Sequence, residues 1–292
     1  MTAPKSPQGK TCILFALPEE QKPFLAGLRR VPDSLDSVEQ KFESNEPQIE
    51  AGDEVVSMLE ATSFSRRTIQ SKLNWRTRLK FGVSGVGMKK AEQATRELLQ
   101  TGDVEALIIC GFAGGLHPEL EPGDLILADS VGVSTISNLR YFPDFRMMNA
   151  AESLTIDDIP NVRIQLGPLV TTECVVIHPE AKRILAETSE AIAVDMETIG
   201  AIRAAQELGV PWLAVRAITD PLGESLPLDF NALSNHEGNV SYGKVILAVL
   251  QRPAKIPALI QLGKRSNLAA KNLASFLLAL LPRLPEGEAD EE

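Results

Sequence analysis

Apolar runs of the length of a buried strand alternate along this chain with segments of helical spacing. Residues 11–17 (TCILFAL) form the first run and end at Pro-Glu-Glu, which predicts a strand that leads into a helix. Residues 79–87 (LKFGVSGVG) predict a strand with a glycine turn, and residues 88–100 predict an amphipathic helix. Further strands are expected at residues 105–116 and 124–134.

The same order of elements returns in the second half of the chain. Residues 191–209 predict a short strand followed by a helix that ends at Gly209, and residues 211–221 predict a last buried strand that ends in Asp-Pro. Strands that alternate with helices are typical of the α/β fold class, in which a mainly parallel sheet carries helices on its faces.

We expect a single domain over residues 11–282. Residues 30–75 are polar and lack clean periodicity, so they form a variable or inserted region, with a strand at residues 54–59 as the one element predicted there. Residues 252–282 are expected to form a helical C-terminal extension. Two terminal segments are expected to be disordered, residues 1–10 and 285–292.

Residues that can bind or react with a ligand fall at or just beyond the ends of the predicted strands: Glu20, Gly85, Gly114, Glu197 and Asp220. Ligands of open α/β sheets gather at the carboxyl ends of the strands. The sequence therefore predicts where a site lies before it indicates a chemistry.

Asp195 and Glu197 flank Met196, where a predicted strand gives way to a helix. An acidic residue at a helix N-terminus usually accepts hydrogen bonds from the first N–H groups of the helix, and we assign this role to Asp195. Glu197 is predicted to point into the pocket, where a carboxylate can accept two hydrogen bonds from a vicinal diol. The alternative is that both acids serve only the helix.

Acids at two other strand ends have both a structural and a chemical interpretation. Asp220 precedes Pro221 and either starts an Asp-Pro turn or acts as a general acid. In the second case, partial burial would raise the pKa of its carboxyl until it can donate a proton near neutral pH. For Glu19 and Glu20, either one of them orients a water molecule as a base, or both belong to the start of a surface helix.

Glycines follow two of the predicted strands, at residues 82, 85 and 87 and at residues 111, 114 and 115. They permit tight turns or a close approach of the backbone to a ligand. Neither segment matches the GxGxxG fingerprint or the P-loop, so no nucleotide cofactor is expected. The histidines are scattered along the chain, at His117, His178 and His236, so we expect no metal site.

A formal net charge of -10 argues against nucleic acid as a partner, because phosphates are attracted to basic surfaces. The three cysteines lie in apolar runs without metal-ligand spacing, which favours a reducing cytoplasm over a compartment that forms disulfides. The polar N-terminus lacks the features of a secretory signal, and no apolar stretch approaches the roughly 20 residues that span a bilayer. We therefore expect a cytoplasmic protein.

Five motifs in order are more specific than any one of them: a strand that ends in glutamate, SGVGMKKAEQA, GFAGGL followed by PGDLILAD, AIAVDMETIGAI and VRAITD. Together they resemble the purine nucleoside phosphorylase and nucleosidase superfamily, particularly its methylthioadenosine/S-adenosylhomocysteine nucleosidase branch. The resemblance covers residues 11–28 and 79–250. It implies a three-layer α/β fold around a twisted, mostly parallel or mixed sheet, and a purine nucleoside as the small-molecule substrate.

The resemblance also implies roles for individual residues. Asp220 would protonate or hydrogen-bond N7 of the purine, and Glu20 would orient the attacking water. Such a pair suits the reaction, because charge builds on an oxocarbenium-like sugar while the base departs. Five residues would bind the substrate: Glu197 at the ribose hydroxyls, Met196 against the sugar, Val175 where backbone groups grip the base, and Gly85 and Gly114 in the pocket wall.

Water and phosphate are the two candidate nucleophiles. Phosphorylases of the superfamily bring arginines to a phosphate site, whereas this chain has ALPEE in place of the first glycine turn. An acid at that position would repel phosphate, so hydrolysis is predicted. Phosphorolysis with Lys89 or Arg216 at the phosphate is the alternative. A nucleoside-binding sensor is a third hypothesis, which the presence of both Asp220 and Glu197 disfavours.

The C-terminal half of the chain resembles the hopanoid-biosynthesis branch, whose members remove adenine from adenosylhopane. Adenosylhopane is therefore the favoured substrate, followed by methylthioadenosine and S-adenosylhomocysteine. The basic, apolar residues 264–281 then have two interpretations: a helix that rests on an anionic membrane surface, or a helix that packs on its own domain or a neighbouring subunit. The resemblance also implies a homo-oligomer, either a dimer or a hexamer.

Overall fold

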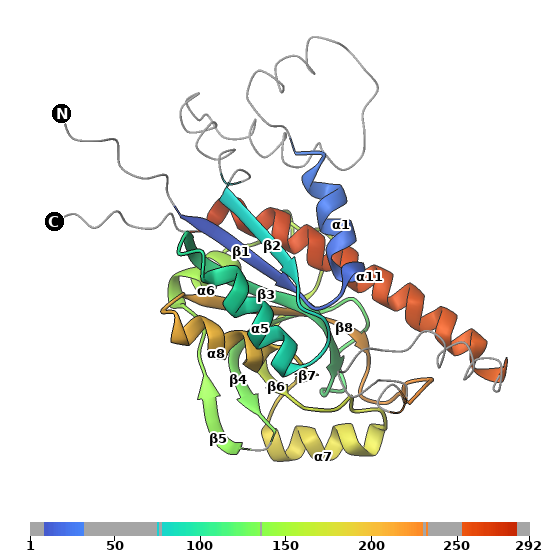
Figure 1. Cartoon of the computed structure of the whole chain (residues 1–292). Helices are drawn as coiled ribbons and strands as arrows, with labels where there is room; N and C mark the ends of the chain where they lie inside the picture. Colours follow the sequence, from blue (N-terminus) through green and yellow to red (C-terminus); the bar gives the residue numbers. More distant parts are fainter. Residues whose placement is uncertain are drawn as a thin grey trace, which may run out of the picture.

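In the part of the chain that the structure describes, eight strands form one sheet with helices on both faces (Figure 1). This computed structural model describes residues 9–31, 75, 78–134, 136–229, 232 and 253–284. The strands are β1 (Lys10–Phe15), β2 (Leu79–Val83), β3 (Val104–Gly115), β4 (Leu125–Val133), β5 (Ile136–Tyr141), β6 (Ile164–Thr171), β7 (Ala193–Asp195) and β8 (Trp212–Asp220). The helices are α1 (Pro18–Leu28), α5 (Met88–Leu99), α6 (Phe145–Glu152), α7 (Pro179–Ser189), α8 (Thr198–Glu207) and α11 (Ile256–Leu280), with short 3₁₀ turns at η2 (Pro253–Lys255) and η3 (Leu281–Arg283).

The sheet is mixed, with more parallel than antiparallel pairs. Its strands follow the order β2-β1-β3-β7-β6-β4-β5, and β8 pairs with both β3 and β4. β1 is parallel to β2 and β3, β8 is parallel to β3, and β6 is parallel to β4 and β7. β7 runs antiparallel to β3, and β4 runs antiparallel to β5 and β8. The predicted α/β fold class is therefore confirmed.

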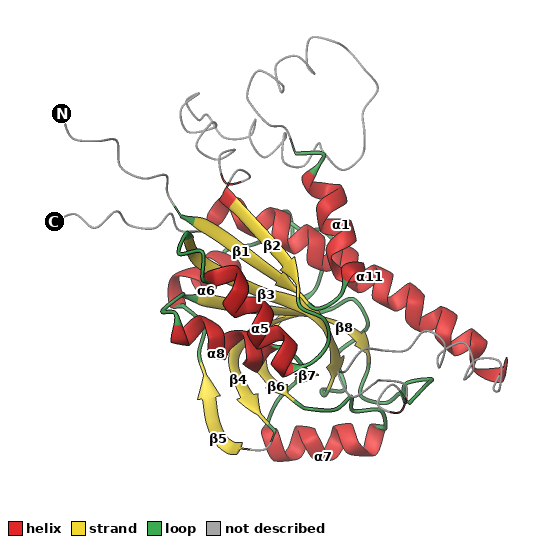
Figure 2. Cartoon of the chain, in the orientation of Figure 1, coloured by secondary structure: helices red, strands yellow, loops and turns green. Residues whose placement is uncertain are grey.

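Alternating side chains of the central strands build a core on each face of the sheet. In β1, Ile13 and Phe15 face a core that α1, α6 and α11 complete. Cys12 and Leu14 face the other way, into a core that α5 and α8 complete. All nine residues of β8 are buried between these layers, which accounts for the long apolar run in its sequence. The result is the three-layer arrangement of helices and strands seen in Figure 2.

α5 and α8 pack closely because α8 carries a glycine where the two helices meet. A Cβ atom at Gly200 would lie 2.0 Å from the backbone oxygen of Met88, the first residue of α5. A larger residue would push the helices apart. The contact therefore holds the glycine turn before α5 against the start of α8, where Glu197 lies.

Most of the predicted elements are confirmed. The helix expected at residues 88–100 is α5, and the helix expected to end at Gly209 is α8, after which Gly209 adopts a φ of +67°. The sequence patterns did not predict β5, α6, β6 or α7. β6 illustrates the reason, because several of its residues are only partly buried and it lacks a continuous apolar run.

Some predictions about segment boundaries fall outside the described residues. These are the strand at residues 54–59, most of the variable region 30–75 and the terminal residues 1–8 and 285–292. The single domain over residues 11–282 stays a prediction. The prediction of disorder is wrong for residues 9 and 10, because Lys10 begins β1 and its ammonium pairs with the carboxylate of Asp103 at 2.7 Å.

The C-terminal helix α11 folds onto its own domain. Its second half packs against α1 and β8 and buries Leu273, Phe276 and Leu277. Of the interpretations of residues 264–281, packing on the same domain is the one that these contacts show. Apolar side chains of the first half, Ile256 and Ile260, are exposed. Within the described ranges, no helix is long and apolar enough to cross a bilayer.

Candidate active site

A cavity of about 230 Å³ opens where β1, β3, β7 and β8 end. Its wall comes from residues that end or directly follow these strands, together with the start of α1, the turn after β2, the loop after β6, the segment after β8 and the first half of α11. This location agrees with the prediction that the site lies at the carboxyl ends of the strands.

Six of the predicted site residues line this cavity: Glu20, Gly114, Val175, Met196, Glu197 and Asp220. Gly85 lies beside the wall rather than in it, and its neighbour Val86 provides the lining. The φ of Gly85 is +81°, and its N–H donates to the backbone oxygen of Ala16 at 3.0 Å. Gly85 therefore forms the turn next to β1. This is one of the two roles that the sequence allowed for these glycines, a tight turn or a close approach to a ligand.

Glu20 is buried at the start of α1, although it is only the third residue of that helix. Its Oε2 accepts hydrogen bonds from the N–H groups of Ala16 at 2.8 Å and Leu17 at 2.9 Å. Its Oε1 accepts from the N–H of Phe112 at 3.0 Å. Burial raises the pKa of Glu20, and these hydrogen bonds oppose the rise.

The two glutamates at this helix start have separate roles. Glu19 is exposed and lies 3.7 Å from Lys22, as expected for the start of a surface helix. Glu20 instead turns inward and ties the helix start to β3 through Phe112. The interpretation of both residues as surface acids is therefore wrong for Glu20.

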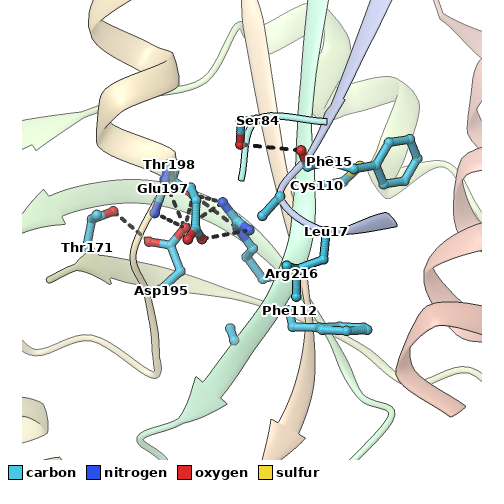
Figure 3. A network of polar contacts seen from close by, with 12 residues as sticks. Phe15, Leu17, Ser84, Cys110, Phe112, Thr171, Asp195, Glu197, Thr198 and Arg216 are labelled. Carbon is cyan, nitrogen blue, oxygen red and sulfur yellow. Dashed lines mark hydrogen bonds and ion pairs between the residues drawn. The ribbon is translucent and has the colours of Figure 1, made fainter. Parts of the chain in front are cut away.

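Arg216 on β8 is the central cation of the site and is buried. Its Nη2 lies 2.5 Å from Oδ2 of Asp195, and its Nη1 lies 3.7 Å from Oε2 of Glu197. Its Nε and Nη2 also donate to Oγ1 of Thr198. Figure 3 shows the guanidinium facing these three side chains at the start of α8. The sequence raised Arg216 only as a candidate for holding phosphate.

Nη1 of Arg216 has no hydrogen-bond partner among the described residues, although it is buried. A Cβ atom at Gly111 would lie 2.4 Å from this nitrogen and 3.1 Å from each carboxylate oxygen of Glu20. Glycine at residue 111 therefore leaves room for the guanidinium of Arg216 to lie close to the carboxylate of Glu20.

The carboxylates around Arg216 outnumber it. Glu20, Asp195 and Glu197 all interact with this one guanidinium. Burial is the main cause that raises the pKa of Glu197 to about 7, with Arg216 opposing the rise and Asp195 adding to it. The pocket therefore holds an excess of negative charge when these acids are ionised.

Asp195 stabilises the start of α8, as predicted. Its Oδ2 accepts hydrogen bonds from the N–H groups of Glu197 at 3.3 Å and Thr198 at 2.9 Å, and its Oδ1 accepts from the hydroxyl of Thr171 at 2.6 Å. Glu197 is held differently, because its Oε1 accepts from the N–H of Gly87 at 2.9 Å. Glu197 also lines the cavity, and its Oε2 forms the ion pair with Arg216.

Asp220 is the last residue of β8, four positions after Arg216, and it lines the cavity. Its Oδ1 accepts a hydrogen bond from Oγ1 of Thr219 at 2.8 Å, and its Oδ2 accepts from Nζ of Lys182 at 2.6 Å. Burial raises the pKa of Asp220, and the ammonium of Lys182 opposes the rise. The sequence did not point to Lys182, because a lysine on an amphipathic helix is usually exposed.

A family model described as the phosphorylase superfamily matches residues 55–251. The chain belongs to the phosphorylase superfamily. A relative in Marinomonas sp. (strain MWYL1), named 5′-methylthioadenosine/S-adenosylhomocysteine nucleosidase, is 26% identical over 162 residues, which are 50% of this chain and 70% of the relative. The resemblance that the five motifs indicated is thereby confirmed, and this member of the phosphorylase superfamily is an enzyme.

Solved structures share the fold. A 5′-methylthioadenosine/S-adenosylhomocysteine nucleosidase from Colwellia psychrerythraea 34H, solved in complex with adenine, has a TM-score of 0.61 at 17% identity and covers 95% of this chain and 96% of its own. The futalosine hydrolase of Helicobacter pylori strain 26695 has a TM-score of 0.59 at 16% identity and covers 93% and 97%. The three-layer α/β arrangement is thus the fold of these enzymes.

Proposed function

We propose that this enzyme hydrolyses the N-glycosidic bond of a purine nucleoside and releases the free base, with adenine as the preferred base. One observation carries the proposal: the wall of a single cavity contains two separate buried acids, Asp220 at the end of β8 and Glu20 at the start of α1. Hydrolysis of this bond needs an acid at the base and an oriented water at the sugar.

In the proposed reaction Asp220 gives a proton to, or shares one with, N7 of the purine. The bond from C1′ of the ribose to N9 then breaks, and its electron pair stays with the base. Glu20 orients the water, whose oxygen bonds to C1′ while its proton passes to Glu20. Glu197 accepts hydrogen bonds from the ribose hydroxyls, and Met196 packs against the sugar.

Val175 and Gly114 complete the proposed substrate site. Gly114 lies beside Asp220, because a Cβ atom at residue 114 would be 3.1 Å from Oδ2 of that acid. A glycine there allows the flat base to approach the carboxyl group. Val175 lies in the loop after β6, where its backbone can contact the edge of the base.

The charges around Arg216 favour water over phosphate as the nucleophile. A phosphate dianion would have to enter a buried space next to Glu20 and Glu197, and the guanidinium of Arg216 is already paired with Asp195. Repulsion between like charges is strong at low dielectric. Phosphorolysis, the alternative, would require these acids to be protonated when phosphate binds.

For the 5′-substituent of the substrate we propose an apolar group, with adenosylhopane as the favoured case. Leu226 and Leu262 line the cavity, and Ile256 and Ile260 are exposed in the first half of the same helix as Leu262, α11. A lipid-like substituent would contact Leu226 and Leu262, and the exposed side chains of α11 would then lie near a membrane surface. The names of the relatives favour methylthioadenosine and S-adenosylhomocysteine as the next candidates.

The deciding experiment measures adenine release from methylthioadenosine, S-adenosylhomocysteine and adenosylhopane, each with and without phosphate. Release without phosphate is the expected result, and the relative values of kcat/KM rank the substrates. Release only with phosphate would establish a phosphorylase instead. Binding of the nucleosides without release would support a sensor. The proposed homo-oligomer, a dimer or a hexamer, is checked by light scattering on the same preparation.

A further inference from the structure

Lys182 is a buried cation that the proposed reaction does not use. It lies on α7, and its side chain is 0% exposed. Its Nζ donates to Oδ2 of Asp220 at 2.6 Å, to the backbone oxygen of Pro221 at 2.9 Å and to the backbone oxygen of Asp220 at 3.3 Å. An ammonium group has three hydrogens, and all three are directed to this one turn of the chain.

A buried lysine destabilises the folded protein unless its ammonium group makes favourable interactions with the residues that it contacts. Removing an ammonium ion from water destabilises the folded protein, and a methionine would fill a similar volume without that penalty. Every acceptor of Lys182 belongs to Asp220 or the residue after it. The ammonium group of Lys182 therefore interacts with Asp220 and its turn, and the packing of α7 alone does not explain a lysine at this position.

We propose that Lys182 is a positioning residue, which orients the carboxyl group of Asp220 and sets the pH range over which Asp220 donates a proton to the base. The proposal rests on the proposed function, in which Asp220 is the general acid. Thr219 donates to Oδ1 and Lys182 donates to Oδ2, so both oxygens of the carboxyl group are held and its plane cannot rotate freely.

Other charged groups face this pair from two directions. Arg265 on α11 interacts with Asp220, and Glu224 in the segment after β8 interacts with Lys182. These two residues also pair with each other, with nitrogen to oxygen distances of 2.5 and 2.9 Å. Because Arg265 and Glu224 largely compensate each other, Lys182 is the dominant charge beside Asp220.

Loss of the ammonium group of Lys182 should change the pKa of Asp220 in one direction. A cation within hydrogen-bond distance lowers the pKa of a carboxyl group by about 1–3 units, so its removal raises that pKa by a similar amount. A general acid works only while it is protonated. The alkaline fall of kcat/KM in a neutral variant at residue 182 should therefore move to higher pH by about 1–3 units. The looser carboxyl group should lower the plateau value of kcat on the order of 10- to 100-fold.

The test compares pH profiles of kcat and kcat/KM for adenine release by four proteins. These are the wild type, Lys182→Met, Lys182→Gln and the control Arg183→Met, which removes an exposed cation from the next residue of α7. Lys182→Gln keeps a hydrogen-bond donor and is the more conservative neutral variant. We expect both neutral variants to show the lower plateau and the upward shift, and the control to match the wild type.

A lower plateau without movement of the alkaline limb would show that Lys182 only supports the fold, and it would overturn the proposal. Failure of both neutral variants to fold would do the same, because the residue would then be needed for stability. No base release by the wild type would instead remove the proposed function. Wild-type release with an unmoved limb in the variants would remove this inference alone.

Discussion

Nη1 of Arg216 lies 3.7 Å from Oε2 of Glu197, although the whole of α8 separates the two residues along the chain. The strands on either side of this helix, β7 and β8, both pair with β3, so the chain returns to the place where the helix began. Asp195 on β7 pairs with the same guanidinium at 2.5 Å. The buried charges of the site are therefore coupled to one another, and changes at any of them have effects of predictable sign.

Asp220→Asn should lower kcat for base release by about two to four orders of magnitude, which is the usual contribution of a general acid. The amide cannot provide an acidic proton, but it has the same shape. Steady-state kinetics with the best nucleoside substrate provides the measurement, and a melting curve checks that the variant is folded. Activity close to that of the wild type would exclude Asp220 as the acid.

Glu20→Gln should lower kcat by about two to four orders of magnitude, because the amide cannot take a proton from the attacking water. Three N–H groups donate to Glu20, so the amide must also direct its own N–H₂ at a donor. This mismatch should cost about 1–3 kcal/mol of unfolding free energy. Glu19→Gln is the matched control, since Glu19 is exposed and should leave both quantities unchanged. Full turnover by Glu20→Gln would move the water-orienting role elsewhere.

Substrate affinity should depend on pH through Glu197. Because its pKa is raised to about 7, this residue is a carboxylate above that pH and a neutral acid below it. The neutral acid accepts hydrogen bonds from the ribose less well, so KM should rise as pH falls from 8 to 6. A 2′-deoxy substrate lacks one of the hydroxyls and should show a smaller change. Equal pH dependence for the two substrates would contradict the role of Glu197.

Arg216→Met should destabilise the protein by about 3–5 kcal/mol, because it leaves buried carboxylates without their cation. The pKa values of Glu20 and Glu197, which burial already raises in the folded state, would then rise further. The loss of stability should therefore be largest at alkaline pH and should diminish as pH falls and the acids become protonated. Differences in Tm between the variant and the wild type at pH 5 and pH 8 measure this effect. Arg203→Met, which removes an exposed arginine from α8, is the control.

Much of the fold was predictable because it depends on local patterns. The apolar runs of β1, β3 and β8 are continuous, since these strands are buried on both faces between helices. Strand ends are also local, so Glu20, Glu197 and Asp220 could be assigned to one edge of the sheet from sequence alone. The structure places all three in the wall of one cavity.

The tertiary structure alone decided which partners these acids have. No local pattern indicates that Arg216 is shared between Asp195 and Glu197, or that Lys182 on α7 reaches Asp220 across 38 positions of sequence. Sequence periodicity reports which face of an element is buried, but not which distant segment lies against that face. The pKa of a buried acid depends on such neighbours. At low dielectric, a single charge within hydrogen-bond distance changes this pKa more than the residues adjacent in sequence do.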